Sequence, residues 1–203
     1  MIGVIDYGLG NVQAFLNIYK RLGIPAVRIV VKDDFKNVDR FILPGVGSFD
    51  HAITLLNDSG LRDTLEDKVM NKKYPVLGVC VGMQILADSS EEGKLSGLGW
   101  IPGSVLKFDD NPDFPLPHMG WNEIKINTNC YLFNNFKKDP LFYFLHSYFF
   151  KTKDPKNIIS NAKYERDFEC VINKGNIYGI QCHPEKSHNN GICFLKNFSE
   201  IKC

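Results

Sequence analysis

The chain has 203 residues, of which 44% are apolar, and its 24 Lys and Arg residues nearly balance its 23 Asp and Glu residues. A chain of this length buries roughly 70% of its unfolded surface on folding, which is enough for one large core. No basic block is present that could neutralise a row of phosphates, so nucleic acid is not an expected partner. No run of about 18 apolar residues and no signal-peptide pattern follow Met1, and we expect a soluble, cytoplasmic protein.

The first half of the chain alternates short apolar runs with segments of helical periodicity. Residues 2–7 predict a strand, and residues 11–23 predict a helix that Gly23 ends. The later segments follow the same alternation, with strands at 27–31, 40–44 and 74–80 and a helix at about 50–70. Strands separated by helices predict an α/β fold with a largely parallel, doubly wound sheet, whose working residues lie at the carboxyl ends of the strands.

After Gly93 the pattern changes to many short β-like runs, which predict a β-rich C-terminal half. They cover residues 104–108, 122–126, 141–150, 158–164 and 169–182, and the last of them predicts a hairpin turned at 174–176. A closing helix follows, with an apolar stripe made of Ile192, Phe194, Leu195, Phe198 and Ile201. No internal repeat or linker is present, so we expect residues 1–203 to form a single domain in which the second half extends the same sheet.

The six cysteines are scattered without close pairs, in a chain too large to depend on disulfides. We expect reduced thiols at Cys80, Cys130, Cys170, Cys182, Cys193 and Cys203. No Cys-x-x-Cys is present and the five histidines are dispersed, so a metal site is not expected.

One cysteine lies in a pattern that favours catalysis. The segment Gly78-Val79-Cys80-Val81-Gly82 joins a predicted strand to a helix-like segment, and it is the thiol version of Gly-x-Ser-x-Gly. Such a turn projects its nucleophile above the sheet, and the start of a helix favours thiolate, which is the attacking species. The alternative is an inert buried cysteine in a tight turn.

A general base and its orienting group could come from residues 178–187, where a β-run ends at His183, Pro184 and Glu185. Glu185 could accept the proton on one imidazole nitrogen while the other nitrogen faces the thiol. The alternative is a surface loop whose His and Glu face water. Cys182 is a rival nucleophile, but neighbours on a strand point to opposite faces, which favours a core position.

A third strand end, at residues 43–49, carries further glycines. Glycine allows close approach and positive φ, so the amides around Val46 and Gly47 could meet an oxyanion formed at Cys80. A phosphate-binding loop is the competing interpretation, although the P-loop Lys-Ser/Thr pair is absent.

Seven motifs, in this order along the chain, resemble the class I, or triad-type, glutamine amidotransferases. They are YGLGN, LPGVGSF, GVCVGMQ, SSEEG, PLPHMGWNE, FLHSY and GIQCHPEKS, and the resemblance runs from Ile2 to about Phe198. Within that family, PHMGWN and HPEKS resemble the glutaminase subunits that work with an imidazole glycerol phosphate cyclase. Val81 and Cys182 depart from the pattern, which commonly has leucine and phenylalanine there.

The resemblance implies a role for each matching residue. Cys80 would be the nucleophile, His183 the acid and base, and Glu185 its orienting group, with Gly47 and Val81 at oxyanion positions. The matching glutamine-binding positions are Gln84, Glu92, Ser147 and Tyr148, and those of the partner interface are Pro117, His118, Met119, Gly120, Trp121, Asn122 and Lys186. Without the resemblance, Trp121 would be interpreted as a core aromatic residue.

The implied activity is hydrolysis of glutamine to glutamate and ammonia through a thioester, without metal or organic cofactor. The ammonia would pass to a separate (β/α)₈-barrel cyclase that makes imidazole glycerol phosphate and an aminoimidazole carboxamide ribotide in histidine biosynthesis. The two subunits would form a heterodimer. Three alternatives remain open. One is a glutaminase that supplies another synthase, such as a sugar amidotransferase of surface glycans; the others are a stand-alone γ-glutamyl hydrolase or cysteine peptidase, and a non-catalytic binding module.

Overall fold

The computed structural model describes residues 1–136 and 139–201. Its strands are β1 (Ile2–Ile5), β2 (Ala26–Ile29), β3 (Arg40–Gly45), β4 (Val76–Cys80), β5 (Ser89–Ser90), β6 (Gly103–Lys107), β7 (His118–Glu123), β8 (Lys125–Ile126), β9 (Leu141–His146), β10 (Tyr148–Thr152), β11 (Ile158–Lys163), β12 (Asp167–Lys174) and β13 (Ile177–Ile180). Its α-helices are α1 (Val12–Leu22), α2 (Phe49–Asp58), α3 (Arg62–Glu66), α4 (Val81–Gln84) and α5 (His188–Ser199). Short 3₁₀ or π segments cover Lys32–Phe35, Asp67–Asn71, Tyr131–Phe133, Pro155–Asn157 and Pro184–Lys186.

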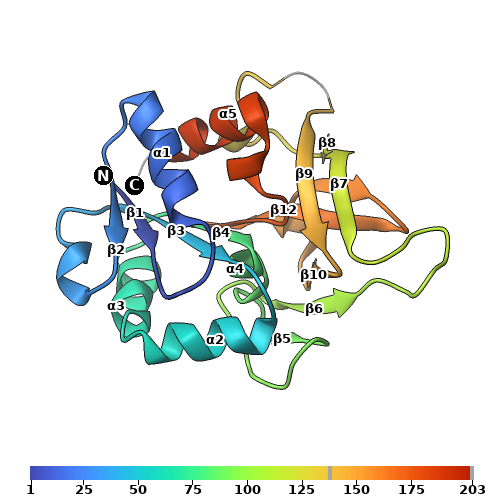
Figure 1. The fold of residues 1–203 in the computed structure, drawn as a ribbon, viewed down its shortest axis with the longest axis horizontal. Coiled ribbons are helices and arrows are strands. Elements are labelled where there is room, and N and C mark those ends of the chain that lie inside the picture. The colour runs from blue at the N-terminus through green and yellow to red at the C-terminus, as the bar shows by residue number, and fades with distance from the viewer. Residues whose placement is uncertain (137–138, 202–203) are drawn as a thin grey trace.

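One large sheet runs through most of the molecule, in the order β2-β1-β3-β4-β13-β12-β10-β6-β5. Neighbours from β2 to β13 are parallel, and β13, β12, β10 and β6 then pair antiparallel. Helices α1 and α5 cover one face of the parallel part, and α2 and α3 cover the other (Figure 1). The expected doubly wound sheet with a β-rich C-terminal half is therefore confirmed.

Helix α1 shows why the first half folds as the sequence predicts. Its buried side chains recur at helical spacing on the face toward the sheet, at Val12, Phe15, Ile18 and Tyr19. The side chain of Asn11 caps the first turn, and Gly23 ends the helix in the left-handed region at φ 68°.

Three predicted elements are each divided in the structure. The predicted helix at 50–70 is broken between α2 and α3, because Gly60 takes a φ of 70°. The run 141–150 splits at Ser147 into β9, which pairs with β7 in a separate two-stranded sheet, and β10, which joins the large sheet. The run 122–126 likewise splits, since Ile124 is buried between β7 and β8.

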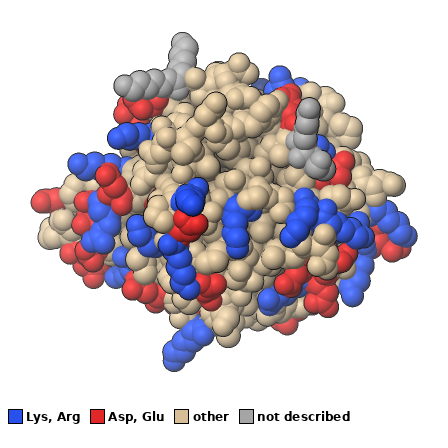
Figure 2. Space-filling model, turned by 180° about the vertical axis from the view of Figure 1, so that it is seen from behind, with Lys and Arg blue, Asp and Glu red and all other residues tan. Residues whose placement is uncertain are grey.

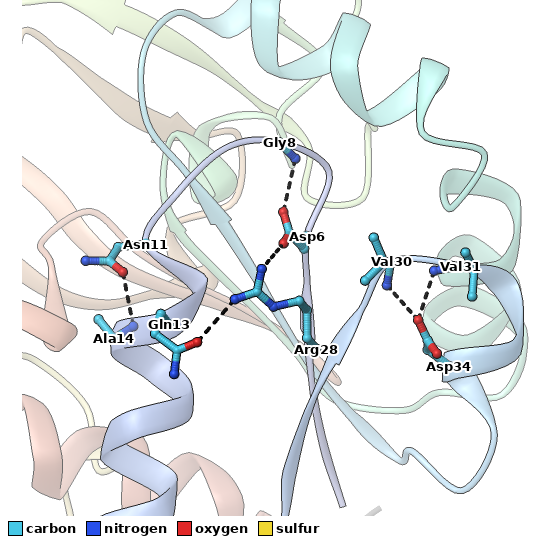
Figure 3. A network of polar contacts seen from close by, with 9 residues as sticks. All are labelled: Asp6, Gly8, Asn11, Gln13, Ala14, Arg28, Val30, Val31 and Asp34. Atoms are coloured by element: carbon cyan, nitrogen blue, oxygen red, sulfur yellow. Dashed lines mark hydrogen bonds and ion pairs between the residues drawn. The ribbon is translucent and has the colours of Figure 1, made fainter.

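Strand β2 ends at Ile29, two residues before the predicted end at residue 31. The amides of Val30 and Val31 donate to Asp34 Oδ2 at 2.8 and 2.9 Å instead of continuing the ladder (Figure 3). These two hydrogen bonds lower the pKa of the Asp34 carboxyl group. Their geometry turns the chain away from the sheet.

A second group of contacts in Figure 3 joins the edge strand to the first helix. Arg28 on β2 bonds Asp6 Oδ2 at 2.8 Å and Gln13 Oε1 at 3.2 Å. The other carboxylate oxygen of Asp6 accepts from the amide of Gly8 at 3.3 Å. The loop YGLGN is thus fixed at the carboxyl end of β1 by structural contacts.

The side of the molecule drawn in Figure 2 carries charges of both signs. Lysine and arginine side chains lie among aspartate and glutamate side chains there, in keeping with the formal net charge of +1. Among the described residues, no helix combines the length and the apolar character that crossing a membrane requires.

Candidate active site

Cys80 lies at a sharp turn between β4 and α4, as the sequence predicts. It is 4% exposed and takes φ 55° and ψ −114°, a conformation that costs a non-glycine residue on the order of 1–3 kcal/mol. The flanking glycines are needed for steric reasons. A Cβ on Gly82 would lie 1.9 Å from Leu43 O, and one on Gly78 would lie 2.5 Å from Gly82 O.

The sheet brings His183 to the same place. Strand β13 is parallel to β4 with Ile180 opposite Val79, so the residues after β13 continue beside Cys80. His183 Nδ1 lies 2.8 Å from Glu185 Oε1, and their side chains are only 4% and 5% exposed. The carboxylate occupies Nδ1, which leaves Nε2 to interact with the Cys80 thiol. The surface-loop alternative for this pair is therefore wrong.

The electrostatics of His183 favour its protonated form. Burial alone would lower the pKa of His183, but its hydrogen bonds with Cys80 and Glu185 outweigh that effect and raise the pKa to about 10. The second carboxylate oxygen of Glu185 is buried and has no hydrogen-bond partner among the described residues. A cysteine beside a protonated, carboxylate-held imidazole is an arrangement suited to thiolate chemistry.

Two segments place backbone amides next to Cys80. Gly45 on β3 is the register partner of Cys80, so Val46 and Gly47 follow directly beside the thiol. Gly47 has a φ of 90° with open space around it, and Val46 is 43% exposed. Val81, the first residue of helix α4, directly follows Cys80 and packs against Gly45. These positions suit donors to an oxyanion.

The residues expected to bind glutamine separate into two places. Gln84 is 3% exposed, and its amide donates to Tyr148 O at 3.0 Å; Ser147 precedes that residue and accepts from the Phe108 amide at 3.2 Å. Glu92 instead accepts from the Phe49 amide at 2.8 Å, at the start of α2 just after the Val46-Gly47 loop. Burial raises the pKa of Glu92.

Most of the residues expected at the partner interface lie on an exposed patch beside the His183-Glu185 segment. Trp121 is 46% exposed and stacks on His188 with ring centroids 5.1 Å apart, so its interpretation as a core residue is wrong. Lys186 Nζ lies 5.7 Å from the centroid of the Tyr143 ring, which Trp121 also contacts. Strand β7 carries Met119 and Gly120 as well as Trp121, and Pro117 directly precedes it. The side chain of Met119 is 66% exposed.

Two members of the expected interface point elsewhere. His118 is 3% exposed and its ring faces the interior, and the Asn122 side chain donates to Lys163 O at 2.8 Å. Cys182 is fully buried, and burial raises its pKa well above the ordinary thiol value. Its interpretation as a core residue is confirmed.

Sequence reasoning missed two polar residues at this site. Gln181 is fully buried, accepts from Gln84 Nε2 at 3.1 Å, and places its own Nε2 3.8 Å from Cys80 Sγ. His146 is buried, and both of its ring nitrogens are hydrogen-bonded: Nε2 to His118 and Nδ1 to the Tyr148 carbonyl. Gln181 could have been found, because it lies two residues before His183 on a predicted strand and so shares its face.

Side chains that could hold a metal ion are not gathered in the part of the chain that the structure describes. The described ranges contain no cluster of three or more His, Cys, Asp or Glu side chains placed to hold a metal ion. The cysteines at positions 80, 130, 170, 182 and 193 are free thiols, as expected, and Cys203 lies outside the described residues.

Comparisons with known proteins agree with this geometry. The family described as "Glutamine amidotransferase class-I" matches residues 3–200. The chain is 52% identical, over 99% of its length and 100% of the relative's, to "Imidazole glycerol phosphate synthase subunit HisH" of Bdellovibrio bacteriovorus. It is 50% identical, with the same coverage, to the protein of that name in Leptospira borgpetersenii.

A crystal structure of a glutamine amidotransferase superposes with a TM-score of 0.74 at 17% identity, covering 98% of both chains. The structure of PurLQS from Thermotoga maritima gives 0.72 at 17% identity, covering 98% of this chain and 96% of that one. These two likenesses concern the fold alone. Together with the match over residues 3–200 and the full-length relatives, they lead to one conclusion: the chain belongs to the class I glutamine amidotransferase family.

Proposed function

We propose that this protein is the glutaminase subunit of an imidazole glycerol phosphate synthase, acting in histidine biosynthesis. The observation that carries the proposal is Cys80 in a strained turn beside the buried His183-Glu185 pair, whose Nδ1–Oε1 distance is 2.8 Å. Relatives at 52% and 50% identity over the full chain bear that subunit name, which favours this pathway over another synthase.

In the first half of the reaction, the Cys80 thiolate attacks the carboxamide carbon of glutamine. The amides of Gly47 and Val81, with that of Val46 nearby, hold the oxyanion, and each such donor is worth ~3 kcal/mol in the transition state. The tetrahedral intermediate then expels its amino group, which takes a proton from the His183 imidazolium and leaves as ammonia. Cys80 is left as a thioester of the γ-carboxyl group.

In the second half, His183 is neutral and accepts a proton from water, which attacks the thioester carbon. Collapse of this intermediate releases glutamate and returns the thiolate and imidazolium. Glu185 holds Nδ1 throughout, so that Nε2 faces the reacting atoms. These steps need no metal and no organic cofactor.

Glutamine is bound between the two groups of residues described above. Gln84, Ser147 and Tyr148 form the group where α4 meets β10, and Glu92 belongs to the group at the start of α2. Residues 1–203 act as one cytoplasmic glutaminase domain. The patch around Trp121 and Lys186 docks a (β/α)₈-barrel cyclase in a heterodimer, and the ammonia passes to it.

Cys80→Ala should reduce ammonia release from glutamine to background in the complex, while Cys182→Ala keeps most of it. The two cysteines are both buried, so the pair controls for a general effect of thiol loss. Both proteins should unfold cooperatively. Full activity of Cys80→Ala would refute the proposed nucleophile, and loss of activity in Cys182→Ala alone would assign it to the other thiol.

The partner's role is tested by glutamate production with and without the cyclase of the same organism and its nucleotide ligand. We expect the isolated subunit to be a poor glutaminase, because rotation of the exposed Val46-Gly47 segment can remove an oxyanion donor, at a cost of ~10²- to 10³-fold in rate. Full turnover by the subunit alone, unchanged on adding the cyclase, would instead indicate a stand-alone hydrolase.

A further inference from the structure

Two buried histidines outside the catalytic mechanism are bonded to each other. His118 on β7 and His146 on β9 are register partners, and His118 Nδ1 lies 3.0 Å from His146 Nε2. Their exposed fractions are 3% and 6%. The His118 ring stacks between Tyr164 and Phe144, at centroid distances of 4.2 and 5.0 Å. Apolar surroundings of this kind would suit two phenylalanines, so the polar pair needs a separate explanation.

The hydrogen bonds around the pair fix both tautomers. His146 Nδ1 lies 2.8 Å from Tyr148 O, and a carbonyl oxygen only accepts, so Nδ1 carries the proton. His146 Nε2 must then accept, and His118 Nδ1 must donate to it. His118 Nε2 is left as an acceptor, 3.3 Å from Asn122 Nδ2. The amide of Asn122 is oriented independently, because its nitrogen donates to Lys163 O at 2.8 Å and its oxygen accepts from the Glu123 amide at 2.8 Å.

Both histidines are neutral in the folded protein at neutral pH. Burial lowers the pKa of His118 to about 4 and that of His146 to about 3. The titratable groups facing them are each other, the catalytic His183 near His146 and the Tyr164 ring on His118. The hydrogen bonds form a row that runs from Asn122 through His118 and His146 to Tyr148. Each bond in this row has one fixed direction, from the Asn122 amide toward the Tyr148 carbonyl.

The Tyr148 carbonyl is also the point where the row meets the active site. It accepts a second hydrogen bond, from Gln84 Nε2 at 3.0 Å. The same nitrogen donates to Gln181 Oε1 at 3.1 Å, and Gln181 Nε2 lies 3.8 Å from Cys80 Sγ. A continuous series of oriented polar groups thus joins Asn122 on strand β7 to the nucleophile.

We propose that His118 and His146 are positioning residues that connect the partner-facing strand to the nucleophile. They hold the Tyr148 carbonyl, and through it the Gln84 and Gln181 amides around Cys80, in a place set by Asn122. This inference rests on the proposed function, in which Asn122 belongs to the strand that meets the cyclase. Docking that moves β7 then moves the amides beside the thiol, without displacing the His183-Glu185 pair.

The decisive variant is His118→Phe/His146→Phe, which removes both histidines from the row of hydrogen bonds. The Tyr148 carbonyl still accepts from Gln84 Nε2, and the Asn122 amide still donates to Lys163 O. Replacing both members of a hydrogen-bonded pair by apolar rings is close to neutral for stability, so this variant should fold. The matched control is Phe168→Leu, since Phe168 contacts both histidine rings without a hydrogen bond, at centroid distances of 5.8 and 5.1 Å. The control changes the packing of the pair and leaves the polar row intact.

The assay measures kcat and KM for glutamine in the complex with the cyclase, together with the Kd of the two subunits. We expect the double variant to lose about 10- to 100-fold in kcat, the range that misplacement by up to 1 Å produces, with KM and Kd changed less than threefold. Phe168→Leu should keep kcat within twofold while lowering the midpoint of thermal unfolding. A double variant with kcat within twofold of the unmodified protein, or a control that loses as much kcat, would overturn the proposal.

A second measurement does not depend on activity. In uniformly ¹⁵N-labelled protein, both histidine rings should show the tautomer protonated at Nδ1, and Asn122→Ala should shift the His146 nitrogens and the Gln84 and Gln181 side-chain amides. Histidine rings protonated at Nε2, or glutamine amide signals unaffected by Asn122→Ala, would overturn the proposed positioning role even if the enzyme were active. If the unmodified complex released no glutamate, the proposed function would fail, while the spectra would still decide the positioning role.

Discussion

The backbone of Cys80 predicts an unusual order of stability for substitutions at that position. With φ 55° and ψ −114°, any side chain there is strained, whereas glycine is not. Changing alanine to glycine normally costs stability, because glycine gains unfolded-state entropy and a buried methyl group is lost. At position 80 the relief of strain opposes both of these costs.

Cys170 supplies a matched reference for that comparison. It is a fully buried cysteine inside strand β12, where the backbone is extended and φ is not positive. The entropy and the methyl group contribute alike at the two positions, so they cancel in the difference. What remains is the strain at Cys80, about 1–3 kcal/mol. At 2–4 °C per kcal/mol for a chain of this size, the difference should reach at least ~2 °C in Tm.

The experiment compares thermal and urea unfolding of Cys80→Ala, Cys80→Gly, Cys170→Ala and Cys170→Gly. We expect the alanine-to-glycine step to lower the free energy of unfolding at position 170 and to lower it much less, or raise it, at position 80. Neither Cys80 variant needs to be active for this measurement. Equal costs at the two positions would refute the argument that the fold holds its nucleophile under strain.

Three further predictions concern residues around the site. Gly82→Ala should lower the free energy of unfolding by about 3 kcal/mol or more in urea, because its Cβ would lie 1.9 Å from a backbone oxygen. Gly60→Ala is the control and should cost only ~1 kcal/mol, because its Cβ would enter open space. Glu92→Ala should lower the free energy of unfolding by ~1 kcal/mol, because it removes the acceptor for the first amide of α2. If Glu92 binds substrate, this variant should also raise the KM for glutamine. An unchanged free energy of unfolding would exclude the capping role. The third prediction concerns pH. Burial lowers the pKa of His118 to about 4 and of His146 to about 3, so only the unfolded chain takes up these protons as the pH falls below about 6.5. Stability should then be lost between pH 6.5 and about 4, and this loss should be smaller in His118→Phe/His146→Phe.

The sequence predicted those parts of the site that depend on local pattern. A cysteine between glycines at a strand end, and His183 with Glu185 two residues later, are each contained within a few residues. Their meeting was expected from the chemistry of the residue types and from the resemblance, and the structure gives its cause: β13 pairs parallel with β4, so the carboxyl ends of the two strands lie at one edge. The extent of the first helix could be predicted for the same reason, since Asn11 and Gly23 are local capping signals.

The parts that the sequence did not predict depend on which strands become neighbours. The run 141–150 is apolar except for His146 and Ser147, and neither residue signals that β9 leaves the large sheet to pair with β7. That pairing places His146 opposite His118 and leaves Trp121 exposed. Gln181 could be assigned to the face of His183, but its contact with Gln84 required the position of α4.

The position of the site in the sheet explains why both halves of the chain are needed for it. Cys80 ends β4, the last strand of the N-terminal parallel part, whereas His183 follows β13, which pairs parallel with β4 and antiparallel with β12. Strand β13 is therefore the junction of the two halves, and Ile180 opposite Val79 sets the register that brings the imidazole to the thiol. A shift of one residue in this pairing would turn His183 to the opposite face and bring Cys182 to the front. The interaction of His183 with Cys80 thus forms only when the antiparallel half has docked in register on the parallel half.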